Sequence, residues 1–491
     1  MQGIELAAGN PLGPLQGVIT LFGLGLAMLV LANFTRAKLV KNTHDFVIAG
    51  RKLGFGFGVA GLLSVWTWVV GILMPAATTF SFGLSGLWWF TVPNGLSVVA
   101  VMPFARKLKA LMPHGYTISE FVSLRYGGSK LATIVVVAGI LFGTLQAVIV
   151  NLKGASLVVA TIFGMNEGAV AIISSIVVLA YIVLGGLWAS IATSTLMCLL
   201  IMVPTAIVVL AAVGQVGGVD AIWQVVAAKG EGLLTVTRQD AFDNFGITFT
   251  LALITATVAG QEFWNVAWGL RENELGRTFF WGGALYYPIA LCLGLLGLVG
   301  IALNVDVVKD LGNDSAALAP FLISHLGLPN WVIYLFVIIV LSACYSTVDG
   351  ALTGVSAITA VDVLHRFFPH IRDNKLIFWT RLSMVITILI SVAVVLSGVD
   401  FVTLLLVTSV IRGAVLVPLI LSIMWDKMNA LAFTSGTIVA LIAGLIARVF
   451  FPGELVSTSV VIVVSAVLPL IIGSLNRDRF DYSILAKAKD I

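Results

Sequence analysis

Long apolar stretches run along the whole chain, separated by short polar connections. A membrane-spanning helix needs about 20 mostly apolar residues, and thirteen segments of the sequence meet that requirement. They cover residues 14–34, 54–80, 84–104, 130–162, 167–185, 189–214, 246–269, 278–303, 330–363, 376–398, 402–424, 430–450 and 456–475. The pattern predicts an all-α integral membrane protein in which residues 1–491 form one transmembrane domain.

Composition and charge agree with that prediction and add an orientation. Of the 491 residues, 59% are hydrophobic and 10% are charged, a balance that excludes a water-soluble fold of this size. Cytoplasmic loops of membrane proteins carry an excess of Lys and Arg. If the N-terminus lies outside, 21 of the 27 basic residues fall on the cytoplasmic side; the exceptions are Lys153, Lys229, Arg238, Lys309, Arg412 and Arg448. The N-terminus is therefore predicted outside and the C-terminus inside. The net charge of +4 is spread over many loops, so no nucleic-acid partner is implied.

Two of the apolar segments are interrupted by glycines and polar residues. They are 54–80 and 246–269, and they lie five spans apart. This spacing predicts two inverted five-helix repeats, 54–214 and 246–424, each opening with a discontinuous helix, followed by two C-terminal helices in 430–475. A broken helix exposes backbone polar groups at membrane depth, where protein or ligand must satisfy them, so a binding site at the midplane is expected. The alternative is that the glycines only allow close helix packing.

The segment around residue 346 carries candidate ligands for a sodium ion. Adjacent hydroxyls at Ser346 and Thr347 follow the small Ala343 in an otherwise apolar span. Hard cations prefer oxygen ligands, and carbonyls freed by an unwound helix together with two facing hydroxyls would supply about five neutral oxygens. The alternative is that both hydroxyls bond to their own helix, as membrane Ser and Thr side chains often do.

Several stretches resemble the sodium:solute symporter family in the expected order. They are DFVIAGRKLG, PHGYTISEFVSLRYG, YIVLGGLWASIATSTL, LSACYSTVDG and WDKMNALAFTSG, and the resemblance covers essentially the whole chain. It implies a LeuT-type core built from helices 2 to 6 and 7 to 11. It also implies that sodium is held by the Ala343 carbonyl, the Ser346 and Thr347 side chains, and carbonyls near Ser64 and Thr67.

One departure from the family pattern lies just after the Gly-Gly-Leu sequence at residues 185–187. Many members have an Asp after the Thr there, linked to a further sodium site, whereas this chain has Ser194. The resemblance therefore implies one sodium per cycle. Within the family, LLSVWTWVVGIL, GASLVVATIFGMN and the Phe263–Trp264 pair resemble Dur-type urea and polyamine permeases, which are usually longer. That likeness implies urea as the first candidate solute, followed by another small amide, an amino acid or a short carboxylate.

Candidate solute-binding residues gather at the two interrupted spans. Trp66 and Trp68 flank the first break and offer flat apolar walls with one N–H donor each. Amides can both donate and accept hydrogen bonds, as an uncharged carbonyl-and-amine solute requires. The remaining candidates are Gln146, Gln261, Glu262, Trp264 and Asn265. The alternatives are packing tryptophans and amides that join two helices.

Four of the ionisable residues within predicted spans are candidates for function, because charge is expensive inside a membrane. Glu262 lies at the second break and is a candidate for binding a solute amine or taking up a proton; the alternative is an ion pair with Lys153 or Arg412. Asp349 is expected either to support the sodium ligands or to lie in the inner vestibule, and Arg412 to act as a gate. Lys153, Asp349 and Arg412 thus form a predicted coupling or gating group.

The sequence as a whole predicts a symporter of a bacterial inner membrane that uses sodium as coupling ion and works by alternating access. One alternative keeps the fold and couples to protons through Glu262; another is a channel or solute sensor. An enzyme is not expected, because no set of nucleophile, base or metal ligands is visible. The expected partners are the lipid bilayer and the small solute, with no obligate protein partner.

Overall fold

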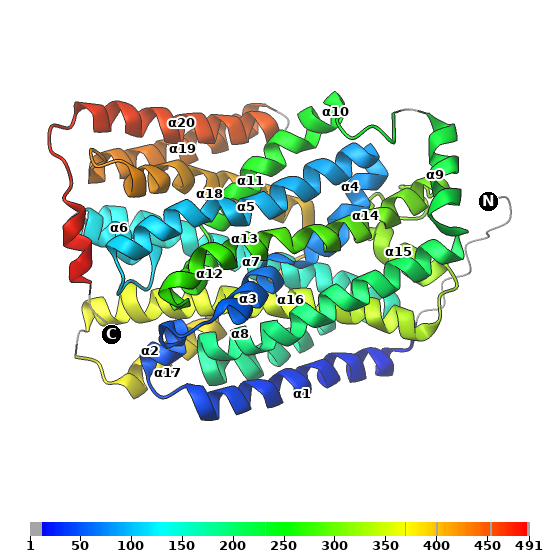
Figure 1. Cartoon of the computed structure of the whole chain (residues 1–491), viewed down its shortest axis with the longest axis horizontal. Coiled ribbons are helices and arrows are strands. Elements are labelled where there is room, and N and C mark those ends of the chain that lie inside the picture. The colour runs from blue at the N-terminus through cyan, green and yellow to red at the C-terminus, as the bar shows by residue number, and fades with distance from the viewer. Residues whose placement is uncertain (1–11, 231, 369, 399–400, 452–453, 489–491) are drawn as a thin grey trace.

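The computed structural model describes residues 12–230, 232–368, 370–398, 401–451 and 454–488. Across these ranges the chain folds into helices joined by short connections (Figure 1). The α-helices are α1 (Pro14–Leu39), α2 (Thr43–Ile48), α3 (Phe55–Trp66), α4 (Val69–Phe82), α5 (Leu84–Leu111), α6 (Ile118–Arg125), α7 (Lys130–Phe163), α8 (Glu167–Gln215), α9 (Gly218–Lys229), α10 (Gln239–Ala241), α11 (Ile247–Val258), α12 (Gln261–Gly269), α13 (Leu275–Ala284), α14 (Tyr286–Ala302), α15 (Leu318–His325), α16 (Asn330–Ile358), α17 (Asp373–Leu396), α18 (Phe401–Met424), α19 (Ala430–Phe450) and α20 (Glu454–Leu475). The shorter 3₁₀ or π segments are η1 (Ala49–Arg51), η2 (Phe242–Gly246), η3 (Glu272–Glu274), η4 (Ser315–Ala317), η5 (Thr359–His365) and η6 (Tyr482–Lys487).

The prediction of an all-α membrane protein is confirmed. Ten of the described helical segments are long and apolar enough to cross a membrane, and the bent pair α3 and α4 adds an eleventh. Each predicted span coincides with a helix or a helix pair. Both interrupted spans are broken helices: α3 and α4 bend by 56° at their junction, and α11 is separated from α12 by Ala259 and Gly260.

The long helix α8 contains two of the predicted spans and reverses direction between them. Gly186 has φ 53° and ψ −135°, a conformation that favours glycine. Tyr181 and Thr193 both donate to Asp349 Oδ2, at 2.8 and 3.2 Å, and Ser190 donates to Oδ1 at 2.6 Å. Residues twelve apart in a straight helix are about 18 Å apart, so one carboxylate could not bind both. The chain therefore folds back at Gly186, with Asp349 joining the two arms.

The two faces of the bundle differ in the elements that cover them. In Figure 1, α2, α6 and the red C-terminal segment η6 lie at one end, and α9 and α15 lie at the other. α1 begins at the end with α9 and finishes at the end with α2. The start of α1 and the C-terminal segment η6 therefore lie at opposite ends of the bundle, as an odd number of membrane crossings requires. The α2 and α6 end carries Arg51, Lys109 and Arg125 and is the predicted cytoplasmic face.

Helix α16 is the buried centre on which both breaks are assembled. Almost every side chain from Val332 to Ile358 is buried, and α16 packs against α7, α8, α3 and α12. By contrast, α1 keeps large apolar side chains such as Leu15, Leu26 and Val30 exposed, as expected of a helix facing lipid. Polar groups on α16 therefore face protein, and each needs a partner.

Candidate functional site

The first break is held open by a side chain from a neighbouring helix. After α3 ends at Trp66, Thr67 takes φ −82° and ψ 62°, and Trp68 is extended with ψ 170°. The first backbone N–H of α4, on Val69, donates to Asn151 Oδ1 of α7 at 2.8 Å. This bond satisfies a group that the interruption leaves without a helical partner.

Helix α16 brings its hydroxyl pair to the carbonyl end of α3. Ser346 Oγ donates to the Ser64 carbonyl at 2.7 Å, and Thr347 Oγ1 donates to the Val65 carbonyl at 2.8 Å. Both hydroxyls also lie near the Ala343 carbonyl, at 3.2 and 3.0 Å. Five neutral oxygens, all from buried residues, thus meet at the break, a donor set that suits a hard monovalent cation.

The structure brings together four of the five residues predicted as sodium ligands and adds the carbonyl of Val65, which lies between Ser64 and Thr67. Thr67 Oγ1 donates to the Leu63 carbonyl of its own helix at 2.7 Å, while the carbonyl of Val65 reaches Thr347. The sequence pointed to carbonyls near Ser64 and Thr67, but a main-chain carbonyl has no side-chain signature, so Val65 could not be singled out. The alternative of bonds within α16 holds only in part, because each hydroxyl reaches both Ala343 and α3.

The two predicted aromatic walls, Trp66 and Trp68, stack against each other. The Trp66 and Trp68 rings stack with centroids 6.1 Å apart and an interplanar angle of 17°. Trp66 Nε1 donates to the Asn94 carbonyl at 3.0 Å, and Phe263 lies edge-on to the Trp66 ring at 5.4 Å. Trp66 is therefore a packed wall, and no planar solute fits between the two indoles in this conformation. Trp68 remains available as a face, because it is partly exposed.

Three of the predicted solute-binding residues at the second break are occupied by protein contacts. Trp264 Nε1 donates to the Val258 carbonyl at 2.8 Å, across the break. Gln261 Nε2 donates to Asn265 Oδ1 at 2.7 Å and to the Tyr116 carbonyl at 3.0 Å, while Gln261 Oε1 accepts from Ile118 N–H at 3.1 Å. Asn265 Nδ2 donates to Thr353 Oγ1 of α16 at 3.4 Å. The structure therefore favours the alternative for these two amides, because Gln261 joins α12 to the start of α6 and Asn265 joins α12 to α16.

Glu262, Arg412 and Gln146 are placed differently from those three. Glu262 is partly exposed, and its Oε2 atom has no hydrogen-bond partner among the described residues. Arg412 is buried on α18 and donates from Nη2 to the Gly143 carbonyl of α7. Gln146, one helical turn after Gly143, is also buried. No ion pair joins Glu262 to Arg412 in the described part of the chain.

The other two predicted coupling or gating residues have structural contacts elsewhere. Lys153 Nζ lies 2.7 Å from Glu167 Oε2 in an ion pair near the start of α8, so it is not the partner of Glu262. Asp349 is fully buried and accepts the three hydroxyl bonds that join the arms of α8. Asp349 is thus packed inside the protein and does not line an inner vestibule, and its hydrogen bonds with side chains of the described residues go to hydroxyls of α8 and not to Ser346 or Thr347.

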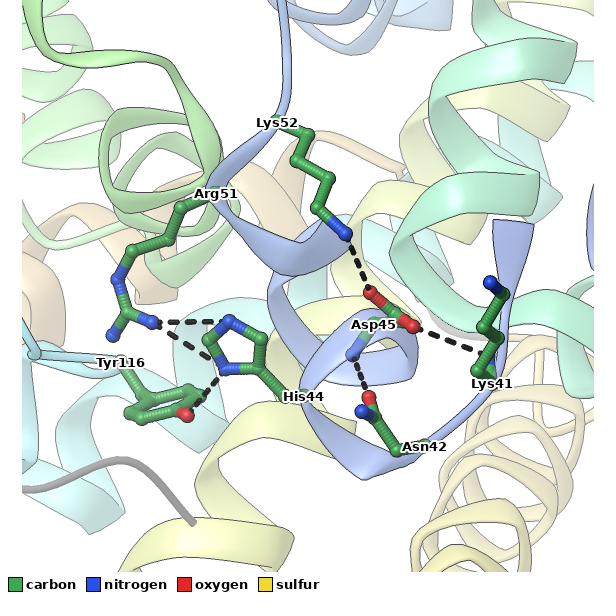
Figure 2. Close-up of polar contacts among 7 residues, drawn as sticks. All are labelled: Lys41, Asn42, His44, Asp45, Arg51, Lys52 and Tyr116. Atoms are coloured by element: carbon green, nitrogen blue, oxygen red, sulfur yellow. Dashed lines mark hydrogen bonds and ion pairs between the residues drawn. The ribbon is translucent and has the colours of Figure 1, made fainter.

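A polar cluster at the predicted cytoplasmic face was not singled out from the sequence (Figure 2). Arg51 donates to the carbonyls of Pro113 and Gly115, both at 3.1 Å, and its guanidinium lies 4.8 Å above the Tyr116 ring. The Tyr116 hydroxyl bonds His44 Nδ1 at 2.6 Å. The two sequence motifs that resemble the family, DFVIAGRKLG and PHGYTISEF, contain Arg51 and Tyr116, and His44 immediately precedes the first motif, so the signal for this cluster was present in the sequence.

The same face ties the inner ends of the two broken helices together. Leu53 N–H donates to the Gly269 carbonyl and Arg271 N–H donates to the Leu53 carbonyl, each at 3.0 Å. Lys109 Nζ donates to the Ala267 carbonyl at 2.9 Å, and Trp268 Nε1 to the Met112 carbonyl at 3.1 Å. The beginning of α3 and the end of α12 are therefore closed against the loop after α5.

Comparison with known proteins identifies the family. The model of the sodium:solute symporter family matches residues 46–444. The chain belongs to this family. Among curated proteins, it is 22% identical over 403 residues to a probable urea active transporter of Schizosaccharomyces pombe, covering 75% of this chain and 59% of that protein. It is also 22% identical over 431 residues to the urea-proton symporter DUR3 of Oryza sativa, covering 80% and 58%, and 25% identical over 369 residues to a bovine sodium/mannose cotransporter, covering 67% and 61%.

The solved structures similar to this member of the symporter family support the LeuT-type fold. A Na⁺-coupled sialic acid symporter in a substrate-bound, outward-open state superposes with a TM-score of 0.80 at 16% identity, covering 95% of this chain and 98% of that one. MhsT in complex with L-phenylalanine gives 0.55 at 12% identity, covering 85% and 97%. The chain spans about three fifths of the length of the urea transporters it matches. The predicted family and the predicted multi-pass helical fold are confirmed.

Proposed function

We propose that this symporter uses the sodium gradient to import urea or a closely similar small amide, across a bacterial inner membrane. The observation that carries the coupling ion is the meeting of Ser346 and Thr347 with the carbonyls of Ser64 and Val65. These oxygens belong to two different helices, so an ion bound between them would hold α3 against α16. Sodium is thereby linked to the conformation of the break.

Alternating access requires that linkage to be reciprocal. Sodium must bind the solute-competent conformation better than the other, and the solute must then raise the affinity for sodium by the same factor. The break provides the physical route, because Trp68 lies three residues after Val65, the second of the two residues that supply the carbonyls. An ion that fixes Ser64 and Val65 would also fix the Trp68 ring.

The urea assignment rests on likeness to the urea transporters and on the polar groups at the two breaks. Trp68 offers an aromatic face with an N–H donor, and Glu262 offers a carboxylate oxygen without a protein partner. A small planar solute with carbonyl and N–H groups needs both kinds of partner.

Proton coupling is the second candidate, because one similar protein is a urea-proton symporter and Glu262 is a carboxylate at a helix break. The two candidates differ in a simple measurement. Sodium coupling requires external sodium for accumulation, whereas proton coupling requires only an inward pH gradient.

The test is uptake of labelled urea into proteoliposomes that contain the purified protein, with sodium or choline outside and the membrane potential clamped. We expect sodium-dependent accumulation in the wild type and its loss in the Ser346→Ala, Thr347→Ala double variant. Ser356→Ala is the matched control, because its hydroxyl is buried on the same helix without a hydrogen-bond partner. Accumulation that ignores sodium and follows the pH gradient would overturn sodium coupling.

A further inference from the structure

The C-terminal segment returns to the predicted cytoplasmic face after the last helix. Residues 476–488, called the strap below, follow α20 and include η6, and they lie beside α6 at the end of the bundle that carries α2 (Figure 1). Most side chains described in the strap are exposed, whereas Leu485 is fully buried and Phe480 and Tyr482 are half-buried. Within the strap, η6 packs against both α5 and α6. A few side chains therefore hold this surface segment across two helices.

Arg125, the last residue of α6, is the centre on which the strap docks. Its guanidinium lies 3.9 Å from the centre of the Phe480 ring and 5.4 Å from that of the Tyr482 ring. The same group donates to three main-chain carbonyls within residues 422–426, at 3.1 to 3.3 Å, where α18 ends. Arg125 is buried, so its charge depends on these carbonyls and ring faces for stabilisation. One side chain thus joins α6, the end of α18 and the strap.

The strap has further anchors on both sides of Arg125. Phe480 N–H donates to the Asp426 carbonyl at 2.9 Å, and Arg479 forms an ion pair with the carboxylate of the same residue at 3.7 Å. On the other side, the ammonium of Lys107 on α5 lies 5.1 Å from the centre of the Tyr482 ring. Helix α5 packs against α4 and α11, one member of each broken helix, whereas α6 and α18 both pack against α7. The strap therefore bridges the helix beside the breaks and the helices beside α7.

Helix α6 connects the strap to the inner closure, which is the set of contacts that the loop after α5 makes with η1 and α12. At the opposite end of α6 from Arg125, the hydroxyls of Thr117 and Ser119 donate to Asp362 of η5, at 2.8 and 2.6 Å. Tyr116, under the Arg51 guanidinium, directly precedes these residues (Figure 2). A helix of eight residues is about 12 Å long and moves as a unit. A displacement at one end of α6 is therefore felt at the other.

The contacts of the strap are of a kind that can break while the rest of the fold stays intact. The carbonyl bonds of Arg125 go to residues 422–426 and not to the strap, so α6 keeps them when the strap leaves. Arg479 is 72% exposed in its pair with Asp426, and exposed ion pairs contribute little to stability. Ring contacts with partly exposed cations are also individually weak. The strap can therefore dock and undock on the folded protein.

We propose that the strap is an inhibitory segment that opposes opening of the inner closure. Opening requires the loop after α5 to separate from η1 and α12, and this loop continues directly into α6. The docked strap holds α6 through Arg125 and holds α5 through Lys107, so both ends of the loop are fixed. Release of the strap removes part of this restraint and lets the closure open more often. The inference goes beyond the proposed function, because it depends on neither the coupling ion nor the solute.

The test is amide hydrogen exchange of the purified full chain in lipid nanodiscs, measured by mass spectrometry on peptides of the inner closure. Gly115, Tyr116 and Ile118 report on it, because their N–H groups are hydrogen-bonded there. The double variant Phe480→Ala, Tyr482→Ala removes three ring contacts with cations. We expect exchange at residues 112–118 to rise by about tenfold or more, as three such contacts at partly exposed sites imply for the docking equilibrium.

Two further variants separate inhibition from mere support of the fold. Ile484→Ala is the matched control, because it shortens an exposed apolar side chain of the same segment, and its exchange should equal that of the wild type. Lys107→Met releases the strap from α5 without changing the strap, and a smaller rise of about twofold is expected. The inference is overturned if exchange at 112–118 in both folded variants matches that of Ile484→Ala. It is also overturned if exchange rises equally in the arms of α8, since a supporting segment would loosen the whole fold.

Uptake of labelled urea into proteoliposomes measures the consequence for transport. The maximal rate should rise by up to about tenfold in the double variant. The urea concentration for half-maximal uptake should stay unchanged, because the strap contacts described above lie on α5, α6 and the end of α18. A maximal rate that is unchanged or lower would overturn the inhibitory role. Wild-type protein that takes up no urea under a sodium or a pH gradient would instead reject the proposed function, and the exchange measurement would then decide the role of the strap.

Discussion

The two broken helices use the same backbone device with different chemistry. At the first break, the freed groups already have protein partners: the Ser64 and Val65 carbonyls meet hydroxyls of α16, and the Val69 N–H meets Asn151. At the second break, Glu262 keeps a buried oxygen that has no hydrogen-bond partner among the described residues. Neutral oxygens from two helices suit a bound cation, whereas a polar side chain with an unused atom suits a solute. This difference is why we propose the ion for the first break and the solute for the second.

The inner ends of the two breaks are nevertheless one structure. The backbone bonds of Leu53 join the start of α3 to the end of α12, and the loop around Tyr116 contacts both Arg51 and Gln261. A change at one break is thus transmitted to the other through packed, hydrogen-bonded segments. The following predictions test how far the two breaks can be separated.

The largest effect is expected from Thr347→Val, which removes one oxygen from the first break while preserving side-chain shape. We expect the sodium concentration for half-maximal uptake to rise by about tenfold or more. A tenfold change corresponds to about 1.4 kcal/mol, and one ligand oxygen should contribute more than that to sodium binding. At saturating sodium, the solute concentration for half-maximal uptake should change little. The measurement is the sodium dependence of labelled-solute uptake in proteoliposomes.

Thr347→Ser is the control for that prediction, because it keeps the hydroxyl and loses only a methyl group. Its sodium dependence should stay close to that of the wild type. Equal changes in the two variants would mean that packing, and not the oxygen, determines sodium affinity, and the division between the two breaks would fail at its first step.

Much of the fold could be predicted from sequence, because burial in lipid leaves a strong signal. The apolar segments, both interruptions and the basic cytoplasmic loops follow from hydropathy and charge alone. The reversal inside α8 was also implied by the short gap between residues 185 and 189, where Gly186 allows the turn. Hydropathy could not predict that Asp349 joins the two arms of α8 by hydrogen bonds, since its three hydroxyl partners lie more than 150 residues away along the chain.

The candidate site could be predicted only where it uses side chains, because a main-chain ligand leaves no mark in the sequence. The pair Ser346 and Thr347 was visible, whereas the carbonyl of Val65 was not. Polar residues at the second break looked alike in sequence, yet Gln261 bonds to the inner loop while Glu262 keeps an unused atom. Which way each side chain of a nine-residue helix faces depends on how the loop before α6 packs against it, and this is a long-range property.

Arg51→Met should have the next largest effect, because it opens the inner closure shared by both breaks. Arg51 donates to two main-chain carbonyls and lies over the Tyr116 ring, and hydrogen bonds from charged groups contribute about 1.5–3 kcal/mol each. We expect sodium-independent efflux of preloaded solute to rise by up to about tenfold. Lys52→Met is the matched control, since its ammonium is mostly exposed and lies 3.9 Å from Asp45. Equal efflux from both variants would contradict a closing role for Arg51.

Asn151→Ala should have a smaller effect, confined to the first break. It leaves the Val69 N–H without its cap, and the loss of a helix cap costs about 0.5–2 kcal/mol. We expect the melting temperature to fall by about 2–4 °C. Trp264→Phe is the counterpart at the second break, where it removes the bond to the Val258 carbonyl. Thr161→Ala on the exposed side of α7 should leave the melting temperature unchanged, and a similar fall in that variant would mean that the break is not special.

The smallest predicted effect is a pH dependence of stability from Glu120, in the helix α6 beside the inner closure. Burial raises the pKa of this carboxyl group to about 8, with Asp362 adding to the shift and the backbone N–H groups of Tyr116 and Thr117 and the charge of Arg51 opposing it. The unfolded chain releases this proton near pH 4.3, so the folded protein holds one proton more between that value and about 8. Stability should therefore fall as pH rises through this window and level off above it.

Glu120→Gln should remove that component of the pH dependence, because the amide keeps an oxygen that can accept the 2.9 Å bond from the Tyr116 N–H but carries no charge at any pH. Above pH 8 its melting temperature should exceed that of the wild type by roughly 2 °C or more, and the two should converge near pH 4. Glu272→Gln, on an exposed carboxyl group at the same face, should follow the wild type throughout. A variant Glu120→Gln that melts in parallel with the wild type at every pH would show that Glu120 stays charged in the folded protein, and the inner closure would then tolerate a buried carboxylate.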